Sequence, residues 1–157
     1  MFVPILGIDP GLTRCGYGVV NLDEKGLVSF ANAGVLATSP QDQVSARLAE
    51  INADLLQLIS EIKPAAIAIE RVVFKSNVTT AMSVAQVSGL VHSIASNLGI
   101  RVTEYSPTEI KKTITGDGRA DKQAIQKMVM NLLSLAKMPT PADAADALAI
   151  AITHAFA

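Results

Sequence analysis

The sequence predicts an α/β fold in which helices flank a mixed β-sheet. Three short apolar segments follow one another at the start of the chain and have the character of strands. After them, segments with the 3.6-residue period of amphipathic helices alternate with further apolar runs. Consecutive strands followed by this alternation favour a mixed sheet with an antiparallel edge.

The opening strands should form a meander. Residues 5–8 are apolar and end at the Asp-Pro-Gly sequence of residues 9–11, a common turn former. Residues 16–21 predict a second strand and residues 27–36 a third. The polar segment 21–26 between them is typical of a hairpin turn.

An amphipathic helix is predicted next. Its apolar side chains fall on one stripe, at Val44, Leu48, Ile51, Leu55, Ile59 and Ile62. Charged residues such as Arg47 lie on its other faces. Ser39 and Pro40 predict an N-cap followed by a first-turn proline, and Lys63-Pro64 predicts the end. We therefore expect a surface helix lying on the sheet.

The rest of the chain alternates between strands and helices. Two further strands are predicted, at residues 65–70 and 101–105. Four further helices are predicted, at residues 77–97, 107–115, 122–133 and 141–156. No internal repeat or low-complexity linker divides the sequence, so we expect a single domain over residues 1–157.

The helix predicted at 77–97 contains no Asp, Glu, Lys or Arg. One apolar stripe consists of Val84, Val87, Val91 and Ile94, and a flatter second stripe of Met82, Ala85 and Gly89. More than one face therefore requires burial. A helix wholly buried within one subunit and a helix at a contact between subunits both fit this pattern.

Composition narrows the class of protein. Half of the 157 residues are hydrophobic, which is enough for a real core. Cys15 is the only cysteine, so an intramolecular disulfide is excluded and a reducing, cytoplasmic compartment is expected. The N-terminus lacks the basic region of a signal peptide, and residues 77–97 are too rich in Ser, Thr, Asn and Gln for a lipid-facing helix. No membrane segment is expected.

The net charge of −1 argues against nucleic acid as a partner, unless the acids have a separate role. Asp9 and Glu70 each end an apolar strand, which is where ligands bind in open α/β sheets. Asp143 and Asp146 lie three residues apart at the start of the last helix and project from one side. These four carboxylates from three elements could converge on one point.

Carboxylate oxygens without His or Cys partners suit Mg²⁺ or Mn²⁺. Two such cations, about 3.5 to 4 Å apart, can activate a water and stabilise the leaving oxygen in phosphoryl displacement. Setting the four acids aside leaves a net charge of +3 on the remainder, which suits a nucleic-acid partner better. His154 should be about 16 Å along the helix from Asp143, so we interpret it, like His92, as structural.

Each acid also has a structural interpretation. Asp9 could serve only the turn that Pro10 and Gly11 form. The two helix acids could do no more than complement the helix dipole. Glu70, next to Arg71, could mark a strand that reaches solvent.

Four segments in order resemble the RuvC family of Holliday-junction resolvases, within the ribonuclease H-like superfamily. They are LGIDPG at 6–11, AIE at 68–70, GDGRADK at 116–122 and DAADALAIAITH at 143–154. The resemblance implies a five-stranded mixed sheet flanked by helices and a homodimer. It implies that Asp9, Glu70, Asp143 and Asp146 bind two Mg²⁺ per subunit, with Mn²⁺ as a substitute.

The family nicks two opposed strands of a four-way junction and leaves 5′-phosphate and 3′-hydroxyl ends, during recombination and repair. A two-fold dimer suits this activity, because each subunit addresses one of two symmetry-related strands. The partner that the resemblance implies is the RuvA–RuvB branch-migration complex.

Cations and one aromatic residue are the candidate DNA contacts: Arg71, Phe74, Lys75, Lys111, Lys112, Arg119 and Lys122. The resemblance gives Lys122 and Lys111 functional roles, and Lys122 also opens a helix whose N-terminus favours anions. An aromatic such as Phe74 could stack at an unpaired crossover base. The family commonly has an aromatic pair here, whereas this chain has Val73 before Phe74. A solvated charged face, or a core Phe, is the alternative for each.

Two rival functions remain. A YqgF-type nuclease acting on ribosomal RNA precursors shares the strand end at Asp9 but does not predict the uncharged helix or the motif at 143–154. A dimeric junction-binding protein would use the acids for structure only. Replacement of Asp9 by Asn separates these hypotheses, because an enzyme would bind without cutting, whereas a structural acid would affect folding or nothing.

Overall fold

The computed structural model describes residues 1–73 and 77–157. Its elements are β1 (Val3–Asp9), β2 (Arg14–Leu22), β3 (Val28–Ala37), α1 (Val44–Ile62), β4 (Ala66–Glu70), α2 (Val78–Leu98), β5 (Arg101–Tyr105), α3 (Pro107–Thr115), α4 (Lys122–Leu133) and α5 (Ala142–Ala155). The five strands have the order β3-β2-β1-β4-β5. The first three pair antiparallel, whereas β4 is parallel to both β1 and β5. The predicted mixed α/β sheet with an antiparallel edge is confirmed.

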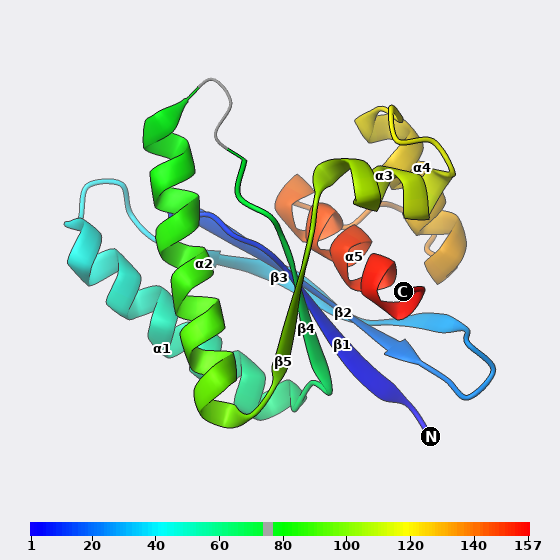
Figure 1. Ribbon diagram of the computed structural model, residues 1–157, viewed down its shortest axis with the longest axis horizontal. Helices are drawn as coiled ribbons and strands as arrows, with labels where there is room; N and C mark the ends of the chain where they lie inside the picture. The colour runs from blue at the N-terminus through cyan, green and yellow to red at the C-terminus, as the bar shows by residue number, and fades with distance from the viewer. Residues whose placement is uncertain (74–76) are drawn as a thin grey trace.

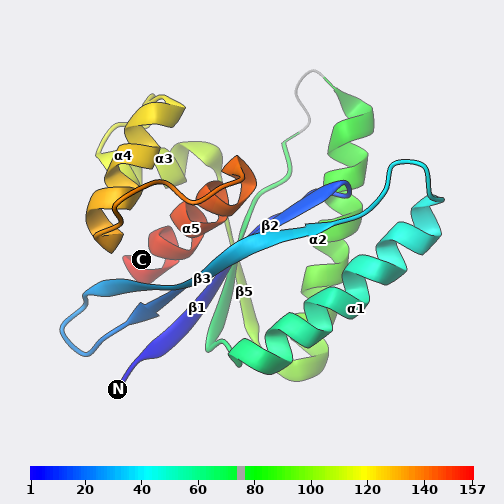
Figure 2. The ribbon, with the colours of Figure 1, turned by 180° about the vertical axis from the view of Figure 1, so that it is seen from behind.

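The sheet lies between two layers of helices (Figure 1). On one face pack α1 and α2, and on the other α5 with α3 and α4 beyond it. Figure 2, from behind, shows the turn between β2 and β3 at one end of the sheet and the whole length of α1 toward the other end. Successive side chains of β1 alternate between the two cores: Leu6 and Ile8 join the α1–α2 side, and Ile5 joins the α5 side.

This alternation decides where the strand-end acids point. Asp9 lies four residues after Ile5, and Glu70 lies two residues after Ala68, which also belongs to the α5 side of the sheet. Side chains an even number of residues apart on a strand point to the same face. Ile8 of β1 pairs with Ile69 of the neighbouring parallel strand β4. The two carboxylates therefore leave adjacent strands on the face that α5 covers.

Glycines allow α5 to lie directly on the sheet. A Cβ on Gly16 would collide with the backbone carbonyl of Asp143, and one on Gly7 would collide with that of Ala147. Gly18 approaches the backbone of Leu148 in the same way. Because these β1 and β2 positions lack side chains, the first turns of α5 come down beside the end of β1.

The predicted start of the first helix is wrong. Helix α1 begins at Val44, and its N-cap is Gln43, which makes no side-chain capping hydrogen bond. The Ser39 carbonyl accepts instead from the backbone N–H of Asp42, at 3.1 Å, in a turn that precedes the helix. The predicted end is confirmed, because Lys63 closes the helix in a left-handed conformation before Pro64.

Burial along α1 also departs from the predicted stripe. Val44 is 44 % exposed, although the apolar period places it on the buried face. Arg47, which the same period places on another face, is only 9 % exposed. The reason is local, because the first turn of α1 lies next to Thr38, which follows β3. The Arg47 guanidinium donates there to the hydroxyl groups of Thr38 and Thr13. An apolar pattern cannot reveal such a polar site.

Helix α2 buries three of the four residues of its first predicted stripe, whereas Val84 is half-buried. Val87, Val91 and Ile94 are buried in the α1–α2 core. Met82, in the second stripe, is 55 % exposed, and Gly89 faces open space. A helix wholly buried within one subunit is therefore wrong for this chain. None of the helices in the described ranges has the length and hydropathy to span a bilayer.

Candidate active site

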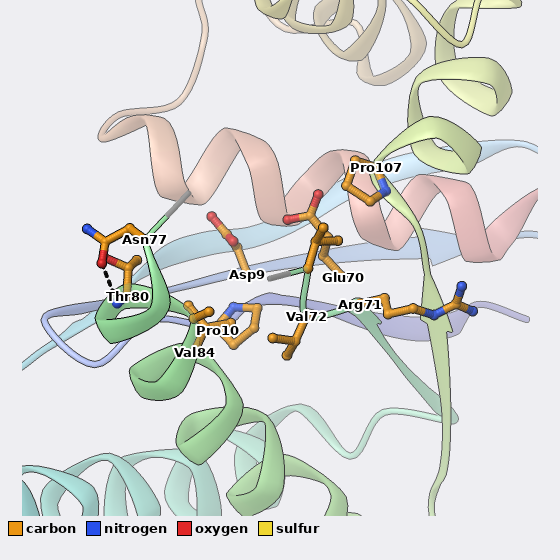
Figure 3. Close-up of a pocket in the computed structure, with 11 residues that line it drawn as sticks. Asp9, Pro10, Glu70, Arg71, Val72, Asn77, Thr80, Val84 and Pro107 are labelled. Carbon is orange, nitrogen blue, oxygen red and sulfur yellow. Dashed lines mark hydrogen bonds between the residues drawn. The ribbon is translucent and has the colours of Figure 1, made fainter. Parts of the chain in front are cut away.

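A pocket of about 350 Å³ opens where β1 and β4 end, and we call it the Asp9 pocket. It is lined by Asp9, Pro10, Glu70, Arg71, Val72, Val73, Asn77, Thr80, Ala81, Val84 and Pro107. Figure 3 shows the carboxylates of Asp9 and Glu70 directed toward α5, whereas the Arg71 guanidinium points away from both. The predicted strand-end acids therefore share one pocket.

A second pocket, of about 280 Å³, adjoins the first, and we call it the Lys122 pocket. It shares Glu70 and Pro107 with the Asp9 pocket and is also lined by Lys111, Lys122 and Asp146. Glu70 thus faces both pockets. Acids and lysines predicted from separate segments lie along one continuous groove.

Four carboxylates define what we call the acidic site: Asp9, Glu70, Asp143 and Asp146. Partial burial, followed by the charges of Asp146, Glu70 and Asp143 in that order, raises the pKa of Asp9 from 3.8 to about 7. Lys122 opposes this effect. Asp9 is therefore the acid whose ionisation costs most.

Two other acids respond to the same environment. Burial, then the charge of Asp146, raises the pKa of Glu70, against the opposing charges of Lys111 and Lys122. Burial also raises the pKa of Asp146, while Lys122 lowers it through its charge and a hydrogen bond. The carboxylates therefore lie close enough to interact electrostatically.

Each helix acid is paired with a cation. Lys122 Nζ, at the start of α4, donates to Asp146 Oδ2 at 3.3 Å. Arg14 Nη1, at the start of β2, lies 3.8 Å from Asp143 Oδ2. Sequence patterns did not point to Arg14, although it follows the Asp-Pro-Gly turn by only three residues.

The four carboxylates lie in one region but do not surround a single point closely enough to form a metal-binding group. Within residues 1–73 and 77–157, no three His, Cys, Asp or Glu side chains form a ready-made metal-binding group. Each helix carboxylate instead has a cation as its partner, Arg14 for Asp143 and Lys122 for Asp146. The donor set still fits a hard divalent cation, which prefers several carboxylate oxygens and would relieve the repulsion that raises the Asp9 pKa.

The remaining candidate DNA contacts divide into separate groups. Lys111 lines the Lys122 pocket, and Arg71 borders the Asp9 pocket while its Nε lies 3.7 Å from Glu104 Oε2. Lys112 and Arg119 are exposed and line neither pocket. Val73 lies at the edge of the Asp9 pocket and is 42 % exposed. The predicted contacts Phe74 and Lys75 fall outside the described residues.

Both histidines have contacts away from the acidic site. His154 Nδ1 shares a 2.7 Å hydrogen bond with the Tyr105 hydroxyl, and burial lowers the pKa of the ring. His92 Nε2 lies 2.9 Å from Glu104 Oε1. These contacts agree with their interpretation as structural residues.

Comparison with known proteins identifies the chain's relatives. The family model described as crossover junction endodeoxyribonuclease RuvC matches residues 5–154. The protein of that name from Renibacterium salmoninarum is 46 % identical over 152 residues, which cover 97 % of this chain and 79 % of that protein. The one from Bifidobacterium longum subsp. infantis is 47 % identical, over 97 % of this chain and 78 % of that protein.

Solved structures agree with these sequence matches. Thermus thermophilus RuvC in complex with a Holliday junction superposes with a TM-score of 0.92 at 36 % identity, covering 98 % of this chain and 93 % of that one. The yeast mitochondrial Holliday junction resolvase has a TM-score of 0.68 at 16 % identity, covers 96 % of this chain and 78 % of its own, and shares the fold. The predicted ribonuclease H-like fold is confirmed. The chain belongs to the RuvC family of crossover junction endodeoxyribonucleases.

Proposed function

We propose that the acidic site is the catalytic centre with which this RuvC-family endonuclease resolves Holliday junctions. The observation that carries the proposal is the group of mutually coupled carboxylates at the ends of β1 and β4, where Asp9 has a pKa of about 7. An acid buried among other acids opposes folding unless a cation compensates for it. This cost disfavours a purely structural role for Asp9, and with it a protein that binds junctions without cutting them.

Family membership implies dependence on a divalent metal. In the finer proposal, the acidic site holds two Mg²⁺ ions per subunit, and Mn²⁺ substitutes because it accepts the same oxygen ligands. When bound, such ions supply an activated water and stabilise the leaving oxygen. The protein's contribution is to fix the carboxylates on two strands and one helix, so that little reorganisation is needed.

Lys122 has a separate role in this proposal. It is the first residue of α4, where Asp121 caps the helix by accepting from the Ala124 N–H at 2.8 Å. The cap and the helix hold the ammonium group at the wall of the groove, opposite Asp146. There it stabilises the negative charge that develops on the scissile phosphate. Lys111, on the same wall, contributes a second positive charge.

The proposed assembly is a homodimer in which α2 faces its copy. The exposed stripe that contains Met82 and Gly89 supports this, because a second subunit would cover apolar surface that this chain leaves open. A two-fold dimer presents two acidic sites to two opposed strands, which yields paired nicks with 5′-phosphate and 3′-hydroxyl ends. The RuvA–RuvB complex is the partner that the family resemblance suggests.

Cleavage of a synthetic mobile four-way junction tests the proposal. A linear duplex and an RNA–DNA hybrid of the same sequence serve as matched substrates, each with Mg²⁺ and with EDTA. We expect paired, ligatable nicks in the junction alone, which EDTA abolishes. Cutting of the hybrid would favour the ribosomal-RNA nuclease hypothesis, and junction binding without any nick would favour a non-enzymatic protein.

A further inference from the structure

A third hollow adjoins the Asp9 pocket on the side away from Lys122, and we call it the Arg47 pocket. It has a volume of about 330 Å³ and is lined by Gly11, Leu12, Thr13, Arg14, Arg47, Thr79, Thr80, Ser83 and Val84. Thr80 and Val84 also line the Asp9 pocket, so the groove continues from the acidic site into this hollow. Its lining residues include two arginines and no acid.

Arg47 contributes to the pocket a buried positive charge that two hydrogen bonds hold in place. Its side chain donates through Nε to Thr38 Oγ1 at 3.0 Å and through Nη2 to Thr13 Oγ1 at 2.9 Å. Both acceptors are neutral hydroxyls, and no carboxylate of the described chain forms an ion pair with this guanidinium. A buried charge is usually paired, because transfer from water is costly. The missing counter-ion is therefore a specific reason to expect an anionic ligand.

The other walls of the pocket also suit an anion. Thr79, Thr80 and Ser83 line it from the first turns of α2, and the Ser83 hydroxyl donates to the Thr79 carbonyl at 3.2 Å. The same end of this 21-residue helix carries the positive end of the helix dipole. Arg14 also lines the pocket, and its Nη1 lies 3.8 Å from Asp143 Oδ2.

The hydrogen bonds around Arg47 connect its pocket to the loop that follows Asp9. Thr38 donates its backbone N–H to the Thr13 carbonyl at 3.1 Å, which ties the end of β3 to the loop between β1 and β2. This loop directly follows Asp9, the last residue of β1, and leads to Arg14, the first residue of β2. A group held in the Arg47 pocket is thereby positioned relative to the carboxylates.

We propose that the Arg47 pocket binds one phosphodiester of the DNA strand being cut, on the side of the acidic site opposite Lys122. This inference rests on the proposed nuclease function and adds a phosphate subsite to it. Because the contact is to the backbone, it positions the strand without reading its sequence. Arg47 and Lys122 then hold the strand at two points on either side of the scissile phosphate.

Two substitutions test the subsite. Thr79→Glu places a negative charge at the pocket rim, in a first-turn position where an acid favours the helix, so the variant should fold. Arg47→Met removes the buried charge and keeps an unbranched apolar side chain. Ala53→Glu, on the exposed face of α1 and outside the groove, is the matched control for added charge. Thermal unfolding of each variant shows whether it is folded.

The measurement is affinity for a labelled four-way junction in EDTA, as a function of salt concentration. Loss of a charged hydrogen bond should weaken binding of Thr79→Glu and Arg47→Met by roughly tenfold or more. The slope of log K against log salt should become shallower by about 0.9 for each phosphate that the variant no longer neutralises. Ala53→Glu should bind within about twofold of the wild type, with an unchanged slope.

The outcomes separate this proposal from the proposed function. If the wild type cuts junctions with Mg²⁺ but Thr79→Glu binds like Ala53→Glu, the subsite is refuted and the nuclease stands. If the wild type fails to cut, the proposed function itself fails. A further experiment measures thermal unfolding with added inorganic phosphate at constant ionic strength. If phosphate stabilises the wild type but not Thr79→Glu, while both bind junctions equally, the pocket takes free phosphate and the DNA subsite is refuted.

Discussion

Replacement of Asp9 by Asn should make the metal-free protein more stable above neutral pH while abolishing cleavage. Partial burial and the neighbouring acids raise the folded-state pKa of Asp9 from 3.8 to about 7. A carboxyl whose pKa rises on folding stabilises the fold fully below the unfolded-state pKa and loses that contribution as pH rises through the folded-state pKa. Asn remains neutral at every pH and avoids this loss.

The magnitude follows from the two pKa values. Each pKa unit corresponds to about 1.36 kcal/mol, so the full cost of ionising Asp9 is on the order of 4 kcal/mol well above pH 7. The linkage relation places part of this cost below pH 5. Between pH 5 and pH 8, the stability advantage of Asp9→Asn over the wild type should grow by roughly 2 to 3 kcal/mol.

Urea unfolding in EDTA at pH 5, 6, 7 and 8 measures this difference. Glu50→Gln, which removes an exposed acid from α1, controls for the loss of one negative charge. Added Mg²⁺ should raise the free energy of unfolding of the wild type at pH 8 more than that of Asp9→Asn, since a ligand stabilises the state that binds it. A variant less stable than the wild type at pH 8, or an advantage that does not grow with pH, would refute the electrostatic reasoning.

Three further predictions concern other parts of the molecule. Lys122→Ala should lower the single-turnover cleavage rate by about 10²-fold or more, with junction affinity reduced much less, because its charge acts on the transition state; equal losses in both would instead indicate a role in binding. Gly16→Ala should destabilise the fold by about 1 to 3 kcal/mol in thermal unfolding, because its Cβ collides with the Asp143 backbone. A Gly16→Ala variant as stable as the wild type would contradict the close packing of α5 on the sheet. Met82→Glu should convert the proposed dimer to a monomer in sedimentation, and an unchanged mass would exclude this stripe from the interface.

Local patterns were sufficient to predict most elements. Strand β5 and helices α3 and α4 have the predicted bounds, because proline, capping residues and apolar periods mark them clearly. Ser106, for example, forms a capping box with Glu109 immediately before Pro107. The start of α1 was misplaced because the Ser39-Pro40 signal belongs to a turn that precedes the helix.

The sheet, the helices and the acids at the ends of β1 and β4 could be predicted from the sequence, because apolar periods and turn-forming residues are local properties. The way α5 meets the sheet could not, since it depends on Gly16 and Gly7 facing the helix backbone in the folded chain. The burial of Arg47 among hydroxyl groups and the pairing of Arg14 with Asp143 could not be predicted either. These contacts join segments far apart in the chain, and whether a charge is buried or paired depends on neighbours that folding alone brings together.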